Sequence, residues 1–332
     1  MGVSDRPARR RLKRVLWILL APILIGVLVL AGFRMAAAVR ESGATAPPGT
    51  TFFATPYGRV AAAVSGPADG APVLIVHGTA AWSGFWRDVA AHLAARGRRV
   101  IAIDVPPFGW SDRDPQARYD RVSQAERLSA LLAAVGKPAT LVGHSFGAGA
   151  ATELALRHPG QLRSLVLVDA ALGDLDPQGG DGAAARALRF TPFAQGVVAA
   201  TVTDPLATGP LLRSFLAKKE AAAPWLDTLE APMRREGSTA AYAAWLPNLF
   251  ARNDGALSRT RAGLAGIKVP VALIWGEADT VTPLAQGRRI ATLTRARSMA
   301  VLPGVGHIPH IEDPRAFLAA LDAALTGEGK AK

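Results

Sequence analysis

The stretch VGHSFGAG, residues 142–149, places Ser145 between two glycines that lie two positions away on either side. Glycines so spaced indicate a backbone turn in which larger side chains would collide. The preceding run, ATLVG, is typical of a buried strand, and the following segment, FGAGAATELALRH, has a helical pattern. A G-x-S-x-G turn between a strand and a helix projects the serine hydroxyl from the carboxyl edge of a sheet. We therefore expect Ser145 to be a displayed nucleophile rather than a structural serine.

Short apolar runs that end in turn residues recur along the chain. They are PVLIVHG (72–78), RRVIAID (98–104), ATLVGHS (139–145), SLVLVDA (164–170), PVALIWG (270–276) and SMAVLPG (298–304). TFFAT and RVAAAVSG add an opening hairpin around residues 56–58. Continuous apolar runs of this kind predict strands buried on both faces of a parallel sheet. Helical patterns alternate with them, at 121–135 and from Asp313 onward, so the predicted class is α/β with helices on both faces of the sheet.

Residues 171–266 interrupt this alternation, because they contain no convincing buried strand. The segment has Ala-rich helical pieces, several prolines and seven large aromatic residues. The aromatic residues are Phe190, Phe193, Phe215, Trp225, Tyr242, Trp245 and Phe250. We interpret the segment as a helical cap inserted over the end of the sheet. Its aromatic side chains favour an apolar ligand, although they are equally suited to the core of the cap itself.

The N-terminus combines a basic cluster with a long apolar run. Residues 1–14 contain six Arg or Lys residues and one Asp, and residues 15–33 contain no charge. Nineteen helical residues span roughly 28 Å, enough to cross the hydrocarbon core of a bilayer. Positive charge before the run predicts a cytoplasmic N-terminus, with the rest of the chain across the membrane. An A-x-A pattern at Ala36 and Ala38 leaves a cleaved signal peptide, and hence secretion, as the alternative to the favoured uncleaved anchor.

The composition excludes several classes of protein. The chain has 332 residues, 50% of them hydrophobic, which is enough for a sizeable core. Its net charge of +12 is concentrated at the N-terminus and is otherwise dispersed, so nucleic-acid binding is not expected. The absence of cysteine excludes disulfides and thiolate metal sites. We expect no metal and no organic cofactor.

A serine nucleophile needs a base and an orienting acid. His307, in LPGVGHIPHIEDP, follows the last predicted strand and is the expected base; His310 is its rival and more suited to packing. Asp279, in WGEADTVTP just beyond the run PVALIWG, is the expected acid. Asp169, after LVLV, and Asp174 remain alternative acids.

Three further predictions concern the surroundings of the serine. His144 neighbours Ser145, and we expect its side chain to point the other way. The backbone N–H of Phe146, at the start of a helix, is one expected oxyanion donor. The loop after PVLIVHG should supply a second, with Thr79 preferred over Ala80. His77 is expected to brace this loop rather than to transfer protons.

The successive motifs resemble those of the α/β-hydrolase superfamily. They are HGTAAWSGFW, DVPPFGWSDR, GHSFGAGAA, LVLVDAA, WGEADTVTP and GVGHIPHIEDP, in the order of the family and covering residues 52–326. The resemblance implies an eight-stranded, mostly parallel sheet, a helical cap at 171–266 and a triad of Ser145, Asp279 and His307. Family members with dehalogenase or epoxide-hydrolase activity use an aspartate nucleophile, so the serine argues against those activities. The HGTA sequence also departs from the HGGG loop of some lipases.

These observations predict the following organisation: a basic cytoplasmic segment at 1–14, a transmembrane helix at 15–33, a linker at 34–50, a hydrolase core at 51–170 and 267–326, the cap at 171–266 and a tail at 327–332. The leading hypothesis is a membrane-anchored serine hydrolase that cleaves a carboxylic ester or related acyl bond of an apolar small molecule. Carbon–carbon bond hydrolysis, perhydrolase activity and a non-catalytic binding role remain alternatives. The oligomeric state is left open.

Overall fold

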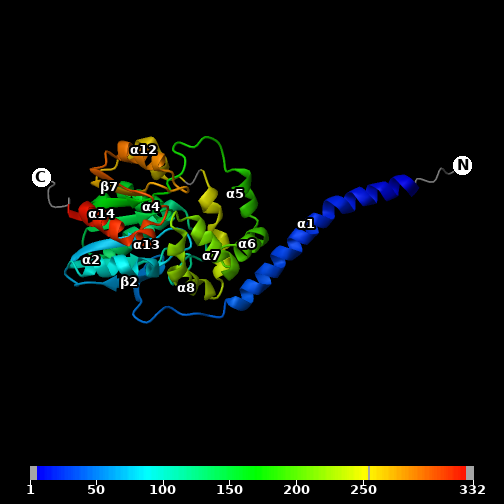
Figure 1. The fold of residues 1–332 in the computed structure, drawn as a ribbon, viewed down its shortest axis with the longest axis horizontal. Helices are drawn as coiled ribbons and strands as arrows, with labels where there is room; N and C mark the ends of the chain where they lie inside the picture. Colours follow the sequence, from blue (N-terminus) through cyan, green and yellow to red (C-terminus); the bar gives the residue numbers. More distant parts are fainter. Residues whose placement is uncertain (1–5, 253–254, 327–332) are drawn as a thin grey trace.

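The computed structural model describes residues 6–252 and 255–326. The predicted tail at 327–332 and the first five residues of the predicted basic segment lie outside these ranges. Figure 1 shows a rounded domain, built around a sheet, from which one long helix projects. The cap helices lie between the sheet and this helix.

The eight strands form a single sheet in the order β1-β2-β4-β3-β5-β6-β7-β8. Their bounds are β1 Thr51–Thr55, β2 Gly58–Ser65, β3 Ala71–Val76, β4 Arg98–Ile103, β5 Ala139–His144, β6 Leu162–Val168, β7 Val271–Gly276 and β8 Ser298–Leu302. Strand β2 pairs antiparallel with β1 and with β4, and all other pairs are parallel. Every strand coincides with a predicted run, so the predicted mostly parallel eight-stranded sheet is confirmed.

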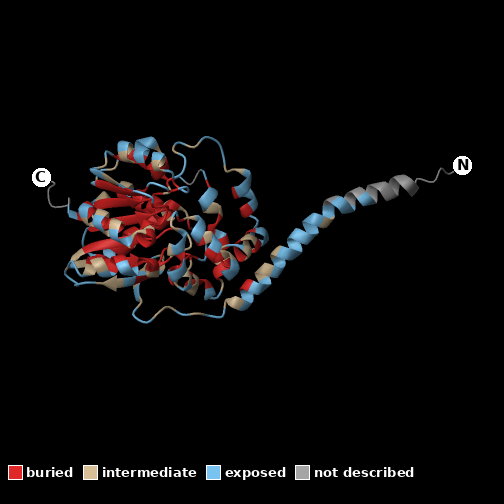
Figure 2. Ribbon diagram, in the orientation of Figure 1, coloured by how far each residue is buried: buried red, intermediate tan, exposed pale blue. Residues whose placement is uncertain are grey.

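Helices cover both faces of the sheet, as Figure 2 shows by the buried strands between them. The helices of the core are α2 Arg87–Ala94, α3 Arg121–Val135, α4 Gly147–Arg157, α12 Leu284–Thr294, α13 Pro309–Glu312 and α14 Pro314–Thr326, with short 3-10 turns η1 Ser83–Trp86 and η2 Pro159–Gln161. Alternate side chains of β3 enter different clusters: Ile75 packs with α2 and α14, whereas Leu74 packs with α3 and α4. The continuous apolar runs arise because both faces of each central strand are buried.

In its described residues, the segment between β6 and β7 contains helices joined by loops and no strand. Its elements are α5 Ala183–Leu188, α6 Thr191–Ala200, α7 Pro205–Ser214, η3 Lys219–Trp225, α8 Leu226–Glu230, η4 Ala231–Arg234, α9 Ser238–Trp245, α10 Pro247–Phe250, η5 Leu257–Arg259 and α11 Arg261–Ala265. Its aromatic residues serve different purposes: Trp225, Tyr242 and Trp245 are buried, whereas Phe190 and Phe193 are exposed. The cap therefore uses only part of its aromatic content for its own core.

Helix α1 runs from Arg6 to Arg40 and includes Pro22. It is longer than the predicted span at 15–33, and the first seven residues of the predicted linker at 34–50 are helical. Met, Ala and Arg in this segment are strong helix formers, and the segment also packs on the cap, where Arg34 and Arg40 form hydrogen bonds. The section Leu20–Arg40 has a mean hydropathy of 2.1 and is almost entirely exposed. By length and composition it could cross a membrane, and a signal sequence would meet the same criteria.

Candidate active site

Three side chains that are distant in the sequence meet at the carboxyl edge of the sheet. Ser145 lies in the turn between β5 and α4, Asp279 follows β7, and His307 follows β8. The Oγ of Ser145 is 2.8 Å from Nε2 of His307, and Nδ1 of His307 is 2.8 Å from Oδ2 of Asp279. A carboxylate can only accept, so Nδ1 carries the proton and Nε2 is left to accept from the serine hydroxyl. All three residues are buried, which protects these bonds from water.

The turn around Ser145 depends on small neighbours. Ser145 has a φ of 50°, in the left-handed region that L-residues rarely adopt. A Cβ on Gly143 would come within 2.7 Å of the Cβ of Ala151, and one on Gly147 would clash with the carbonyl oxygen of His77. The two glycines are therefore required because α4 and the β3 loop approach the turn closely. This explains the G-x-S-x-G pattern in physical terms.

The strain at this turn leads to a stability prediction. We expect Ser145→Gly to unfold with a free energy about 1 kcal/mol higher than Ser145→Ala, because glycine tolerates a positive φ and alanine does not. Both variants lack the hydroxyl, so the comparison isolates the Cβ. Urea denaturation of the two variants would measure the difference. A less stable glycine variant would show that the turn is not strained.

Backbone and hydroxyl groups fix the carboxylate of Asp279. Its Oδ1 accepts from the N–H groups of Val281 and Thr282, at 2.7 and 2.9 Å, and its Oδ2 accepts from the hydroxyl of Thr282 at 2.5 Å. Burial by itself would raise the pKa of Asp279, but the bonds from His307 and Thr282 outweigh it and hold the pKa below its usual value. Asp279 is therefore an ionised acceptor for the histidine. Sequence reasoning missed Thr282, although Asp followed by Thr three positions later has the spacing of a local side-chain to backbone bond.

The alternative acids occupy different environments. Asp169 is fully buried, and its Oδ1 accepts from the N–H of Gly276 at 2.8 Å. Burial, and secondly the nearby carboxylate of Asp279, raise the pKa of Asp169 well above its usual value. Asp169 is therefore the member of this acidic pair that takes up a proton first as the pH falls. Asp174 is exposed and makes no part of the site.

The prediction that His144 points away from the site is wrong. Its Nε2 lies 2.9 Å from the backbone carbonyl of His307, and its ring is 5.3 Å from the ring of His307. Burial, and secondly the charge of His307, lower the pKa of His144 to about 3, so the neutral ring donates through Nε2. The loop after β8 folds back over the end of β5, which brings its backbone to this ring. His144 thus helps to hold the loop that carries His307.

His310 and His77 are both buried and are not bonded to Ser145. His310 stacks on Trp86 at 4.0 Å between ring centroids, and burial lowers the pKa of His310 well below its usual value. His77 accepts from the N–H of Val105 through Nε2, at 2.8 Å, and its Nδ1 lies 2.7 Å from the carbonyl of Gly78. Burial lowers the pKa of His77 to about 4. Both rings are therefore neutral, and His77 ties the β3 loop to the β4 loop.

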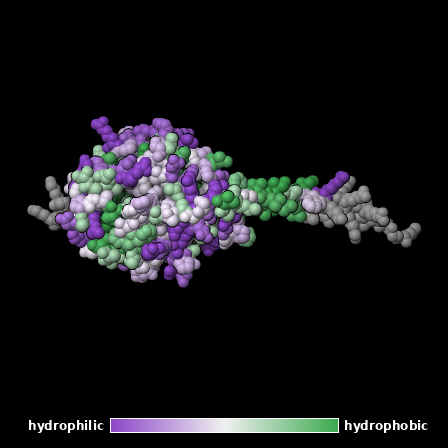
Figure 3. Space-filling model, turned by 90° about the horizontal axis from the view of Figure 1, so that it is seen from below, coloured by the Kyte–Doolittle hydropathy of each residue, from purple (hydrophilic) through white to green (hydrophobic). Residues whose placement is uncertain are grey.

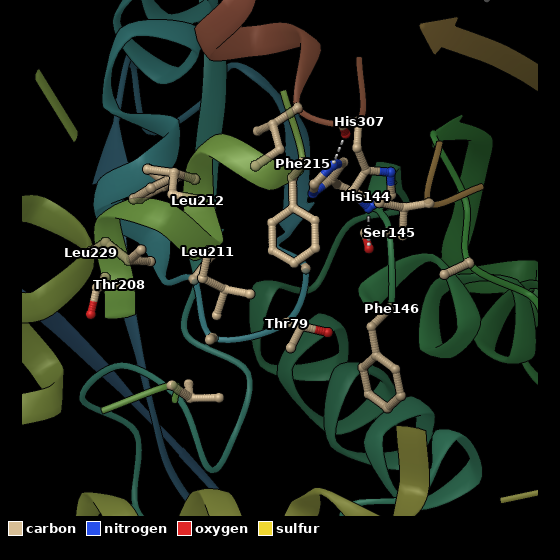
Figure 4. Close-up of a pocket in the computed structure, with 18 of the residues that line it drawn as sticks. Thr79, His144, Ser145, Phe146, Thr208, Leu211, Leu212, Phe215, Leu229 and His307 are labelled. Atoms are coloured by element: carbon tan, nitrogen blue, oxygen red, sulfur yellow. Dashed lines mark hydrogen bonds between the residues drawn. The ribbon is translucent and has the colours of Figure 1, made fainter. Parts of the chain in front are cut away.

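The expected oxyanion donors lie on either side of the serine. Phe146 begins the turn into α4, and Thr79 lies on the loop after β3 (Figure 4). Among the described residues, neither backbone N–H has a hydrogen-bond acceptor. Ala80 has a φ of 56° and also lines the pocket, so Thr79 and Ala80 remain alternative second donors. The geometry provides room for an anion between the β3 loop and α4.

An apolar pocket of about 180 Å³ leads to Ser145. The cap supplies one wall, through Leu211, Leu212 and Phe215 (Figure 4). The core supplies the other wall, through Phe85 and Trp86. Within residues 6–252 and 255–326, no lysine or arginine lines this pocket. The same residues contain no group of three His, Asp or Glu side chains arranged to hold a metal ion. The arrangement can present an uncharged acyl group to an activated serine.

Comparison with known proteins gives the family. Residues 71–314 match the family model of the alpha/beta hydrolase fold. A 2-hydroxymuconate semialdehyde hydrolase from Pseudomonas sp. strain CF600 is 30% identical over 267 residues, covering 78% of this chain and 86% of that protein. A pimeloyl-[acyl-carrier protein] methyl ester esterase from Chromobacterium violaceum is 31% identical over 255 residues, covering 76% and 93%. The crystal structure of a membrane phospholipase A, a bacterial virulence factor, superposes with a TM-score of 0.64 at 24% identity, covering 98% and 100% of the two chains.

The chain therefore belongs to the α/β-hydrolase superfamily, as its motifs predicted. Within that superfamily, the relatives include both a semialdehyde hydrolase and a methyl ester esterase. The family assignment establishes a hydrolase fold but does not determine which bond is cleaved, so that question has to be argued from the chemistry of the site.

Proposed function

We propose that this protein is a membrane-anchored serine hydrolase that cleaves carboxylic esters with an apolar acyl group. The observation that carries the proposal is the continuous chain of hydrogen bonds from Ser145 through His307 to Asp279, with 2.8 Å at each link. A serine bonded to a histidine that is oriented by a carboxylate is the arrangement that activates a hydroxyl for attack.

The reaction follows from the positions of these groups. His307 removes the proton of Ser145 through Nε2 as the oxygen attacks the ester carbonyl carbon. The N–H groups of Phe146 and Thr79 stabilise the negative charge on the carbonyl oxygen. The protonated His307 then gives its proton to the departing alcohol, which leaves an acyl-enzyme. Water, deprotonated in turn by His307, hydrolyses the acyl-enzyme and releases the acid.

The lining of the pocket supports an uncharged acyl group. Leucine, phenylalanine and tryptophan side chains surround the approach to Ser145, and the described lining contains no cationic residue. Burying a carboxylate in such surroundings without a partner is costly. An apolar acyl chain therefore fits this lining better than a substrate that carries a free carboxylate.

Carbon–carbon bond hydrolysis is the second candidate, because a relative with 30% identity is named a 2-hydroxymuconate semialdehyde hydrolase. Purified protein should be assayed with p-nitrophenyl esters of graded chain length and, separately, with 2-hydroxymuconate semialdehyde. We expect the higher kcat/KM for esters. Turnover of the semialdehyde with no ester hydrolysis would replace the ester proposal with the second candidate. No turnover of either, with an unreactive Ser145, would favour a binding role.

Two observations support α1 as an uncleaved anchor with a cytoplasmic N-terminus. Six basic residues precede the apolar run, and such charge stays on the cytoplasmic side. Near the A-x-A pattern, Ala37 is buried against the folded domain, and Arg34 donates to the cap residue Gln195 at 3.0 Å. This part of α1 belongs to the folded protein. Mass spectrometry of the membrane fraction after alkaline washing should find the intact N-terminus; a soluble protein that begins after Ala38 would refute the anchor.

A further inference from the structure

In the C-terminal part of α1, two arginines bond to the cap and apolar side chains face outward. Arg34 binds Gln195, and Nη2 of Arg40 donates to the carbonyl of Thr203 at 3.1 Å. Met35 follows Arg34 and Val39 precedes Arg40 in the sequence, and these two apolar residues are 73% and 82% exposed. The apolar outer surface of the helix therefore extends past the span at 15–33 and runs alongside the cap.

The adjacent edge of the cap is also apolar. Helix α6 approaches α1 so closely that a Cβ on Gly196 would lie 2.7 Å from the Cβ of Leu30. Phe190 and Phe193, at the start of α6, are 65% and 40% exposed, and Leu206, at the start of α7, is 85% exposed. We call these three residues the cap edge. In Figure 3 the hydrophobic surface of α1 reaches the globular domain, where further hydrophobic patches adjoin it.

The cap edge belongs to the same chain segment as the wall of the pocket. Val202 and Thr208, which flank Leu206 in the sequence, line the active-site pocket. A second cavity, which includes Arg40 of α1, shares Thr208 and Met233 with that pocket. The active-site pocket is therefore separated from the base of the anchor by a thin wall of cap residues.

A bilayer that covers the outward side of α1 up to Val39 would also meet the cap edge, because α6 is packed against the same part of α1. Exposed phenylalanine and leucine side chains beside a membrane helix gain by entering the interfacial region. Arg34 and Arg40 bond to groups of the cap, which directs their charges away from the side of α1 that would contact lipid. Each feature of this surface thus fits a lipid environment.

We propose that the cap edge (Phe190, Phe193 and Leu206) rests in the interfacial layer of the bilayer, and that the substrate is an amphiphilic acyl ester that enters the pocket from the membrane. This inference rests on the proposed function and specifies its substrate class and point of entry. The surface is a membrane contact of the cap, in addition to the span of α1.

The absence of cysteine from the chain makes the contact directly measurable. Single-cysteine variants Phe193→Cys, Val27→Cys and Phe52→Cys, in the full-length protein, can be labelled with an environment-sensitive fluorophore. Phe52 is a matched control, because it is 39% exposed on the edge strand β1. The labelled proteins are reconstituted in phosphatidylcholine–phosphatidylglycerol vesicles that contain spin-labelled lipid as quencher.

We expect the lipid quencher to reduce emission from positions 193 and 27 and to leave position 52 unchanged. Quenching at position 27 without quenching at position 193 would overturn the proposal that the cap edge contacts the bilayer, while still supporting α1 as a membrane anchor. No quenching at 27 would refute the anchor itself and, with it, the inference. Equal quenching of the fluorophores at positions 193 and 52 would likewise contradict a specific lipid contact of the cap edge.

A kinetic test separates docking from catalysis. For Phe193→Ser combined with Leu206→Ser, we expect kcat/KM to fall at least about fivefold for a long-chain ester presented in vesicles and to change less than about twofold for a water-soluble butyrate ester. Phe52→Ser should change neither value. An equal fall on both substrates would indicate damage to the domain and overturn the proposal. An unmodified protein that hydrolyses neither ester would refute the proposed function instead.

Discussion

Replacement of Ser145 by alanine is expected to lower kcat for ester hydrolysis by at least about 10⁴-fold. The loss should appear in kcat rather than in KM, because the hydroxyl acts on the carbonyl carbon while the apolar walls bind the acyl group. The substitution keeps the Cβ and the backbone conformation, and it removes one hydrogen bond to His307. The folded state should therefore persist, which near-ultraviolet circular dichroism can verify.

A matched control is available in the cap. Ser214 is exposed on α7 and its hydroxyl donates to the carbonyl of Leu211 at 2.6 Å, without lining the pocket. Ser214→Ala should retain wild-type kcat. A fluorophosphonate probe should label the wild-type protein once, at Ser145, and should not label His307→Ala. Wild-type turnover by Ser145→Ala would rule out this serine as the nucleophile.

The second large effect distinguishes the two buried aspartates. Asp279→Asn is expected to reduce kcat by about 10³- to 10⁴-fold, because an amide at this position no longer fixes the Nδ1–H tautomer of His307. Asp169→Asn is expected to keep kcat within about tenfold of the wild type, because His307 bonds to Asp279 and an amide oxygen can still accept from the N–H of Gly276. Both substitutions are similar in volume, so each serves as the control for the other.

The ranking of these two variants decides which carboxylate orients the histidine. Steady-state kinetics on a single p-nitrophenyl ester, together with thermal unfolding of each variant, supplies the comparison. A severe loss of kcat in Asp169→Asn with a mild loss in Asp279→Asn would show that Asp169, after β6, orients the histidine instead of Asp279, after β7. Equal and severe loss in both would show that the two carboxyl groups act as one unit.

Much of the site was predictable because short sequence patterns indicate the strands and turns that carry its residues. The apolar runs gave all eight strands, and Gly143 and Gly147 indicated the tight turn at Ser145. Placing Ser145, Asp279 and His307 after parallel strands implied that they share one edge, since the carboxyl ends of parallel strands lie together. The structure brings these three residues within hydrogen-bond distance.

Other features depend on contacts that no local pattern encodes. The prediction for His144 failed because alternation along a strand says nothing about which loop covers the strand end. The raised pKa of Asp169 depends on its burial beside Asp279, which lies in another strand connection. The linker boundary shifted to Arg40 because helix propensity and packing on the cap extend α1 together.

The amino-acid sequence by itself determined the order of the strands and helices, the choice of Ser145 as candidate nucleophile with its two expected partners, and the apolar span near the N-terminus. These follow from periodicity and turn chemistry over a few residues. Only the tertiary structure decided which aspartate is ionised, which histidines are neutral and how the cap meets α1. The physical reason is that desolvation and long-range packing, such as the bond from Arg34 to Gln195, depend on groups that only the folded chain brings together.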